Sequence, residues 1–440
     1  MEGERKTLTQ LSVPICLETL FYMLSGMVDT LMLSSVSDQA VGAVGTANTY
    51  IGVFIIMFGV ISSGMVAVMS QNIGAGKPGI AYQARQLGLV FNALTGILMS
   101  FILAAFSGWI LKIVSIAPAL LEPAEIYLKI VGGASFLNAL IPIFSSYLRV
   151  FGYTKHSLIG TVVGNVINII LNSVFLFVFN WGVMGVAAAT VFSKVVNLII
   201  VAAMGAVLIK AKQSPERAQP RKILAQIVKI GFPSAFETAL YNVAMTFIVC
   251  FMNHMDTDGM NVTARSYAMQ IANFSYCVGA ALAQANAIMT GWRIGAKKYE
   301  ECDRGTRKAV IYGLVTATCF SVTFAMTGRF IVHIFTDDTQ MIELVVKLLI
   351  VDIFLEFGRV TNLVYGQALK TSGDAIFPVI IGAIFMYLFA VGGTYFLGIH
   401  MGLLAVGAYI AMAGDECARA IGMVLRWKSG KWKSKSLIEL

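Results

Sequence analysis

Hydrophobic residues run through the chain in long segments, and short polar stretches that contain Gly, Pro and charged residues separate these segments. A helix needs about 20 apolar residues to cross the hydrocarbon core of a bilayer. The segments reach that length, so the pattern predicts membrane-spanning helices. Reading them in order gives twelve predicted spans, at residues 8–33, 41–70, 86–112, 123–149, 156–180, 183–210, 223–253, 261–291, 306–335, 341–369, 374–398 and 402–426.

Composition supports an all-α membrane protein. Of the 440 residues, 58% are hydrophobic and 12% are charged, whereas soluble domains are about 45–50% apolar and about 25% charged. The six cysteines are scattered without metal-ligand spacing, so we interpret them as buried small hydrophobes. No cleavable signal peptide is evident, because the first apolar segment is longer than the core of a signal sequence.

The net charge of +9 is distributed unevenly between the connections. The connections at 34–40, 113–122, 181–182, 254–260, 336–340 and 399–401 hold no Lys or Arg. The positive-inside rule therefore predicts that both termini are cytoplasmic in a multi-pass protein of the cell membrane, with no role in nucleic-acid binding. The termini and the alternate connections, by contrast, are basic and hold Arg5, Lys6, Lys77, Arg85, Arg149, Lys155, Lys210, Lys212, Arg217, Arg221, Lys222, Arg293, Lys297, Lys298, Arg304, Arg307, Lys308, Lys370, Arg426, Lys428, Lys431, Lys433 and Lys435.

The chain contains an internal repeat. Pro14, Glu18, Thr19 and Tyr22 recur 219 residues later (233 − 14) as Pro233, Glu237, Thr238 and Tyr241. Three further segments recur at offsets of 220 or 221 residues, namely IGAGK from Ile73, LRVFG from Leu148 and GVMGVAAA from Gly182. Four matches in one order predict a duplication, although shared helix-start composition is the simpler alternative.

The repeat predicts two lobes of six helices. We expect an N-lobe at 1–212, a cytoplasmic linker at 213–221, a C-lobe at 222–428 and a cytoplasmic tail at 429–440. Six is an even number, so both lobes start on the same side and the repeats are parallel. Transporters built from parallel repeats bind substrate in a cleft between the lobes, and rocking of the lobes gives alternating access.

By their position within the predicted spans, we single out ten charged residues. A charge at the bilayer centre costs about 2.5–3.5 kcal/mol on insertion scales, so these side chains should face the protein interior. The set holds seven acids and three bases, and an acidic interior favours cations or protons. Its members are Glu18, Asp29, Lys194, Glu237, Asp352, Glu356, Arg359, Asp415, Glu416 and Arg419.

The tenth span gives the most specific prediction. Asp352, Glu356 and Arg359 share one helical face, and we expect Arg359 to neutralise Glu356 and leave Asp352 unpaired. Asp415 and Arg419, four residues apart, suggest a second pair. Structural ion pairing is the alternative to function for these paired residues.

Unpaired carboxylates inside a membrane indicate function by default. We therefore expect Asp352 and Glu237 to exchange a proton or to hold a sodium ion. Asp29 lies near the outer end of its helix, and its side chain either has a coupling role or reaches the outer interface. Glu18 either repeats the role of Glu237 or supports the start of the first helix.

Polar stripes provide candidate substrate contacts. The asparagines of the fifth span lie at i, i+3 and i+7, on one face, and the eighth span carries a second polar and aromatic stripe. Such stripes suit a flat, amphipathic ligand, but they also occur as ordinary interhelical contacts. The candidates are Asn165, Asn168, Asn172, Tyr241, Gln270 and Asn273.

Catalytic and cofactor motifs are absent from the sequence. The four histidines lie near span ends without paired metal-ligand spacing, and there is no P-loop for ATP. We expect no enzyme activity and no cofactor.

These residues resemble the multidrug and toxic compound extrusion (MATE) transporters along the whole chain. The resemblance depends on Pro14, Val28-Asp29-Thr30, IGAGK, the asparagines of the fifth span with the following GVMGVAAAT, and the duplication. Membership would imply two V-shaped six-helix lobes and export of cationic, aromatic molecules in exchange for Na⁺ or H⁺. We expect a monomer in the lipid bilayer.

The resemblance also implies roles for single residues. Asp29 matches the family's acid of the first helix, with Asn168 beside it, and Glu237 and Asp352 match the C-lobe cation site of sodium-coupled members. Asn172 stands where some members have aspartate, and the pair Glu356 and Arg359 matches only one branch, so the coupling ion stays open. Alternatives are a flippase for lipid-linked oligosaccharides, which should have a cationic cleft, a membrane-embedded enzyme, and a channel.

Overall fold

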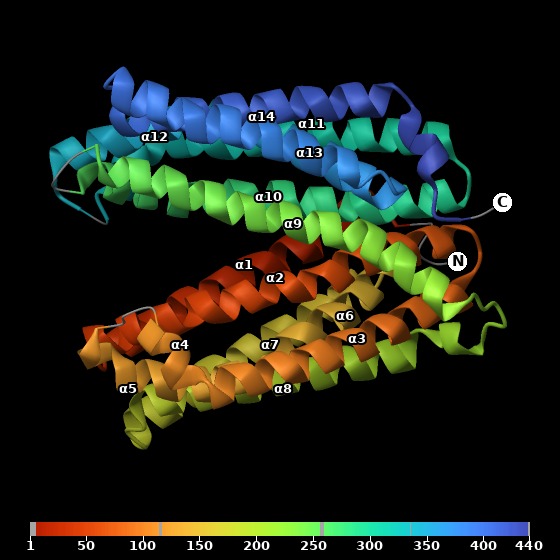
Figure 1. Ribbon diagram of the computed structural model, residues 1–440, viewed down its shortest axis with the longest axis horizontal. Coiled ribbons are helices and arrows are strands. Elements are labelled where there is room, and N and C mark those ends of the chain that lie inside the picture. Colours follow the sequence, from red (N-terminus) through yellow and green to blue (C-terminus); the bar gives the residue numbers. More distant parts are fainter. Residues whose placement is uncertain (1–5, 114–116, 256–258, 335, 439–440) are drawn as a thin grey trace. The chain divides into compact units, whose positions relative to one another are not determined.

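The computed structural model describes residues 6–113, 117–255, 259–334 and 336–438, and each regular element among them is a helix (Figure 1). Arg5, residue 335 at the end of the ninth predicted span and residues 439–440 of the predicted tail lie outside the described residues. Close contacts divide the chain into two compact units: unit 1 holds Leu17–Gly231, and unit 2 holds Thr7–Cys16 together with the chain from Phe232 onward.

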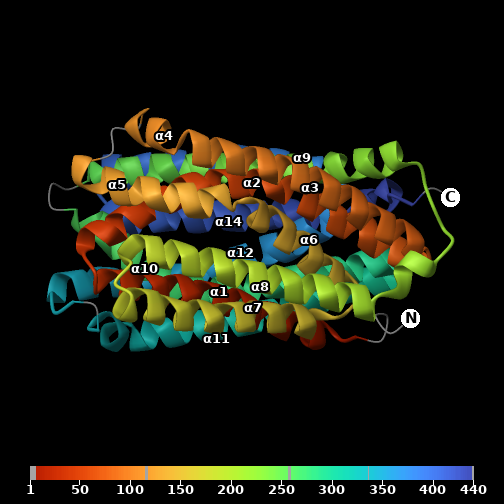
Figure 2. The same ribbon diagram turned by 90° about the horizontal axis from the view of Figure 1, so that it is seen from below.

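Unit 1 contains α2 to α8, most of α1 and the first part of α9. Helix α3 packs against α2 and α6, and α8 packs against α6 and α7 (Figures 1 and 2). Two π-helical segments, at Leu128–Gly132 and Val174–Val178, continue α5 and α7. The bounds are α1 Leu8–Ser34, α2 Asp38–Gly74, α3 Pro78–Ala105, α4 Ser107–Ile113, α5 Pro118–Tyr127, α6 Phe136–Val150, α7 Thr154–Ser173 and α8 Gly182–Leu208.

Unit 2 is organised around α12, which packs against α10, α11 and α14. Two π-helical segments, Met386–Val391 and Thr394–His400, continue α13, and a short 3-10 helix at Lys431–Lys435 follows α14. A second short 3-10 helix, at Lys210–Gln213, follows α8 in unit 1. The bounds are α9 Pro220–Asn253, α10 Met260–Gly295, α11 Tyr299–Val332, α12 Thr339–Ser372, α13 Ile376–Phe385 and α14 Leu404–Lys428.

Each predicted span coincides with one helix or with consecutive helical segments. By length and composition, eight helices of the described chain can cross a membrane, and the pair Pro118–Gly132 and Phe136–Val150, bent by 42°, is a ninth candidate. The three remaining long helices, α10, α12 and α14, are more polar. Because large side chains such as Leu31, Phe101 and Met326 are exposed on apolar helices, these surfaces suit lipid, and the chain is a multi-pass membrane protein.

Two helix starts differ most from the prediction. Helix α3 begins at Pro78, whereas the third predicted span begins at 86. Helix α11 begins at Tyr299, whereas the ninth predicted span begins at 306. The first two turns of each helix contain polar or charged residues, such as Gln83 and Arg85 in α3 and Glu300 and Arg304 in α11, which the hydropathy pattern assigned to loops. A helix continues past the hydrocarbon core wherever its backbone hydrogen bonds continue, so apolar length gives only a lower limit.

The duplication is visible in the backbone. Left-handed φ angles occur at Gly76 and Lys297, and again at Gly152 and Gly373, both pairs separated by 221 residues (297 − 76 and 373 − 152). Each position ends a helix in its half, where the chain reverses before the next helix. The two halves therefore use the same helix stops, and glycine is favoured at three of them because it adopts positive φ without strain.

The C-terminal segment of unit 2 is folded against the ends of three helices. Trp432 is 1% exposed, and its ring stacks on Trp427 of α14 with centroids 4.1 Å apart. Its indole nitrogen donates to the carbonyl oxygen of Trp427 at 2.9 Å, and Trp427 donates to Asp303 of α11 at 2.9 Å. The Trp432 ring also packs against Tyr299 at the start of α11, with centroids 5.9 Å apart, so the segment ties α14 to α11.

We expect Trp432→Ala to lower the free energy of unfolding of unit 2 by about 3–5 kcal/mol, because it removes a buried aromatic side chain and leaves a cavity. Thermal and denaturant unfolding of the detergent-purified protein would measure this. Trp109→Ala is the matched control, since Trp109 is 65% exposed. Equal losses for the two variants would contradict a stabilising role for the folded tail.

Candidate functional site

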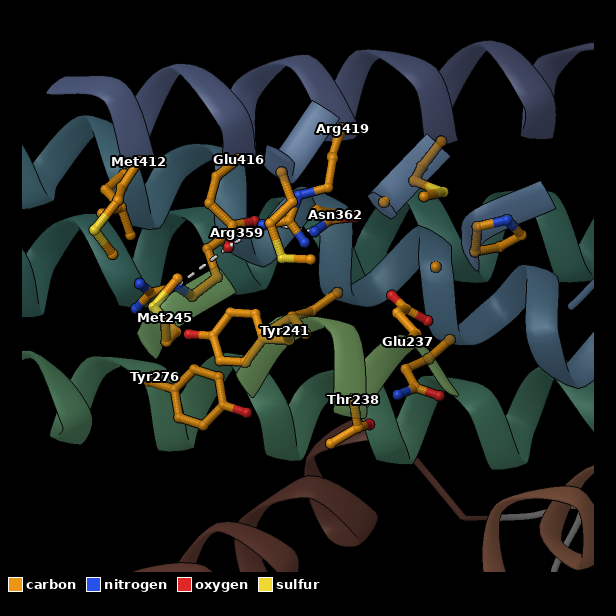
Figure 3. Close-up of a pocket in the computed structure, with 18 of the residues that line it drawn as sticks. Glu237, Thr238, Tyr241, Met245, Tyr276, Arg359, Asn362, Met412, Glu416 and Arg419 are labelled. Atoms are coloured by element: carbon orange, nitrogen blue, oxygen red, sulfur yellow. Dashed lines mark hydrogen bonds and ion pairs between the residues drawn. The ribbon is translucent and has the colours of Figure 1, made fainter. Parts of the chain in front are cut away.

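A cavity of about 420 Å³ lies within unit 2, between α9, α10, α12, α13 and α14. Its walls combine charged, aromatic and methionine side chains, and Figure 3 shows many of them converging on one space. Among the lining residues are Glu237, Tyr241, Met245, Met269, Asn273, Tyr276, Asp352, Arg359, Asn362, Lys370, Met386, Tyr409, Met412, Glu416, Arg419 and Met423.

Helix α12 supplies the central charges. Asp352, Glu356 and Arg359 follow one another at four and three residues, so they lie on one face, and this face is buried within unit 2. Glu356 forms an ion pair with Arg359. The Arg359 guanidinium also lies 5.7 Å from the centre of the Tyr276 ring. The intrahelical pair therefore places a cation beside the aromatic wall of the cavity (Figure 3).

Helix α14 adds a second cluster. Arg419 donates to both carboxylate oxygens of Asp415, at 3.0 and 2.6 Å, and its Nη2 lies 2.9 Å from Glu416 Oε1. Glu416 in turn accepts from Asn362 Nδ2 at 2.9 Å and lies 3.8 Å from Arg359 Nε. The two clusters form one network, in which three carboxylates share two guanidinium groups.

Asp352 differs from the other buried acids of unit 2. Its side chain is 3% exposed and lines the cavity, yet among the described residues it has no hydrogen-bond donor and no ion-pair partner. Its electrostatic interaction with Arg359 acts across two helical turns, while Arg359 itself contacts Glu356 and Glu416. The carboxylate of Asp352 is therefore available to a ligand in the cavity.

Glu237, which we expected to be unpaired, has a basic partner. Lys370 Nζ lies 2.5 Å from Glu237 Oε2, between α9 and the end of α12. We had assigned Lys370 to a cytoplasmic connection, but α12 continues to Ser372 and carries it to the cavity wall. A sodium ion shared by Glu237 and Asp352 would therefore have to compete with a tethered ammonium.

The same ion pair exists in unit 1. Arg149 Nη2 lies 2.7 Å from Glu18 Oε1, and Ser157 and Thr161 donate to the Glu18 carboxylate at 3.1 and 3.3 Å. Glu18 and Glu237 are repeat partners, and so are Arg149 and Lys370, since LRVFG recurs as LKTSG. The duplication has therefore kept an acid–base pair in each half, with Glu18 buried and Glu237 partly buried.

A double-mutant cycle would test this pair. We expect Glu237→Gln and Lys370→Met to be non-additive by roughly 0.5–3 kcal/mol of unfolding free energy, as is usual for residues in direct contact. Unfolding of the two single variants and of the double variant measures the coupling. Glu18→Gln with Arg149→Met is the matched cycle in unit 1, and additive effects in both cycles would contradict the assignment.

The polar face of α7 lies against α1 in unit 1. Asn172 Nδ2 donates to Asp29 Oδ1 at 2.6 Å and lies 3.4 Å from Asn168 Oδ1. Asn165 donates to the carbonyl oxygen of Phe21 at 2.9 Å. The structure thus brings Asp29, Asn168 and Asn172 together, while Asn165 joins two helices.

The predicted contacts on α9 and α10 separate into two groups. Tyr241 and Asn273 line the cavity of unit 2. Gln270 is exposed and lies outside the cavity lining, because the cavity meets the face of α10 that carries Met269, Asn273 and Tyr276. The cavity also contains Tyr276, Tyr409 and five methionines, which sequence reasoning had no signal to separate from ordinary core residues.

Comparisons with known proteins find similarity along nearly the whole chain. A family model described as MatE matches residues 14–174 and 233–396, two segments that start at the repeated prolines. The uncharacterized transporter YisQ of Bacillus subtilis is 31% identical over 98% of this chain and 96% of its own length. The probable multidrug resistance protein NorM of Thermotoga maritima is 26% identical, with coverage of 99% and 94%.

Solved structures share the fold. The structure titled "MATE in the straight conformation" superposes with a TM-score of 0.88 at 19% identity, covering 97% of this chain and 96% of that one. An outward-facing MATE transporter of the MOP superfamily superposes with a TM-score of 0.86 at 18% identity, covering 98% and 96%.

Proposed function

The chain belongs to the MATE family of transporters, which are not enzymes, and from this membership we propose that it exports cationic, aromatic or amphipathic small molecules across the cell membrane in exchange for Na⁺ or H⁺. Relatives over most of the chain are named as multidrug resistance proteins. In this proposal both termini are cytoplasmic, as the basic connections indicate.

An unpaired buried carboxylate on a cavity wall rich in tyrosine and methionine supports the proposal most strongly. Asp352 supplies one negative charge, and the tyrosines and methionines around it supply polarizable surface. Aromatic faces attract cations, and methionine adapts to ligands of different shape. A flat organic cation therefore matches both the charge and the surface of this site.

Antiport follows from competition for one charge. A coupling cation or proton at Asp352 removes the negative charge that a cationic substrate needs, so the two ligands exclude each other. Each ligand shifts the equilibrium between the two access states only to the extent that it binds one state more tightly than the other. Asp352 is the main coupling residue of the proposal, and Asp29 in unit 1 is the second candidate.

Charge favours drug export over flipping of lipid-linked oligosaccharides. Glu356 and Asp415 contact the lining arginines, and with them the site holds five acids against three bases. A pyrophosphate headgroup requires the opposite balance, since phosphates bind where basic groups are in excess.

Ethidium retention in drug-sensitive cells tests the proposal. Energised cells that express the chain should retain less ethidium than cells with an empty vector, and a protonophore or removal of Na⁺ should abolish the difference. Membrane expression is checked with a C-terminal tag. Retention equal to the vector control for ethidium and for several other organic cations would overturn the proposed substrate class.

A further inference from the structure

Lys194 lies in the middle of α8, inside a span of high hydropathy. An ammonium at this depth costs about 2.5–3.5 kcal/mol on insertion scales, so it needs a partner of opposite charge or a function. Its Nζ donates to Asn138 Oδ1 of α6 at 2.9 Å. An amide satisfies one hydrogen-bond donor but does not neutralise the charge.

Asp29 of α1 is the counter-charge of Lys194. The two side chains interact electrostatically, and neither shows an interaction of this kind with another charged side chain among the described residues. Each of them also binds one amide, since Asn172 donates to Asp29 and Asn138 accepts from Lys194. Among the described residues no direct ion pair joins Asp29 to Lys194, so the two charges interact over a distance.

Oxygen atoms gather around Asp29. Its carboxylate, Asn168 Oδ1 and Asn172 Oδ1 belong to one cluster, and Asn172 Oδ1 is buried without a hydrogen-bond partner. Carboxylate and amide oxygens are the ligands that hard cations prefer. A free cation would find suitable ligands here, but it would also meet the positive charge of Lys194 in surroundings of low dielectric constant.

We propose that Lys194 is a tethered cation that balances Asp29, excludes Na⁺ from the oxygen cluster of unit 1, and leaves the binding of a coupling cation to unit 2. Lys194 acts through Asp29 and is a specificity-determining residue for the ion. The statement that the coupling cation binds in unit 2 rests on the proposed ion exchange. The exclusion of Na⁺ from Asp29 does not depend on any transported substrate.

Binding of ²²Na⁺ to the full-length protein in detergent tests the proposal without transport. All variants carry Asp352→Asn, so that the main carboxylate of the unit 2 cavity cannot contribute. We expect no saturable ²²Na⁺ binding to D352N, and at least about tenfold more bound ²²Na⁺ for D352N/K194M. K194R keeps the charge and should bind no more than D352N, and adding D29N to D352N/K194M should remove the gain.

Two results would overturn the proposal. One is saturable binding to D352N that D29N abolishes, since Na⁺ would then reach Asp29 beside Lys194. The other is the absence of binding to D352N/K194M when size-exclusion chromatography shows a folded protein. K194Q replaces K194M if that variant does not fold. Failure of ethidium export would refute the proposed substrate class but would leave these binding results unchanged.

Discussion

Asp352→Asn is expected to reduce uphill export to passive equilibration while leaving the protein folded. The carboxylate is buried at the cavity wall without a hydrogen-bond or ion-pair partner among the described residues, so the amide removes a charge without stranding an opposite one. Exchange of one monovalent cation for one cationic substrate moves no net charge, so the concentration gradient of the coupling ion drives it. At a tenfold ion gradient, loss of coupling therefore forfeits about a tenfold accumulation, which corresponds to about 1.4 kcal/mol.

The measurement is the steady-state accumulation ratio of a fluorescent cation in energised vesicles. Asp337→Asn is the matched control, because the Asp337 carboxylate is 93% exposed and the same substitution there should leave the ratio unchanged. An accumulation ratio for D352N within twofold of wild type would refute the role of Asp352. A folded variant with substrate binding but no accumulation would support it.

Arg419→Met is expected to lower the free energy of unfolding of unit 2 by about 3–5 kcal/mol, because removing one member of a buried ion pair leaves the other charge uncompensated. Here two carboxylates, Asp415 and Glu416, lose their shared guanidinium. Thermal and denaturant unfolding of the purified protein measures the loss. The double variant R419M/D415N should recover part of it, since one of the stranded charges is then absent.

An exposed pair provides the control for Arg419. Arg307 contacts Asp303 at 2.8 Å on the surface of α11, and such pairs contribute about 0–1 kcal/mol. Arg307→Met should therefore have a small effect. If R419M were no more destabilising than R307M, the network of α12 and α14 would not stabilise the unit.

Local spacing allowed part of the site to be predicted from sequence. Asp352, Glu356 and Arg359 lie within two turns of one helix, so their shared face follows from helical geometry alone. The twelve spans could be predicted for a similar reason, because lipid imposes a length on each apolar segment.

Contacts between helices were harder to predict. The pair of Glu237 and Lys370 joins α9 to α12, and Lys370 looked like a loop residue because the apolar segment ends before the helix does. The repeat held a usable signal, since Lys370 occupies the place of Arg149 and Glu237 that of Glu18. For Gln270 the sequence held no such signal, because the helices packed around α10 decide which of its faces meets the cavity.

The most direct test of ion coupling at Asp352 uses purified protein in proteoliposomes, with a Na⁺ gradient and a H⁺ gradient imposed separately. We expect one of the two gradients to drive a cationic dye uphill through the wild-type protein and neither to do so through D352N. Uphill movement through D352N under either gradient would contradict this expectation, and so would a wild-type protein that equilibrates the dye without responding to either ion.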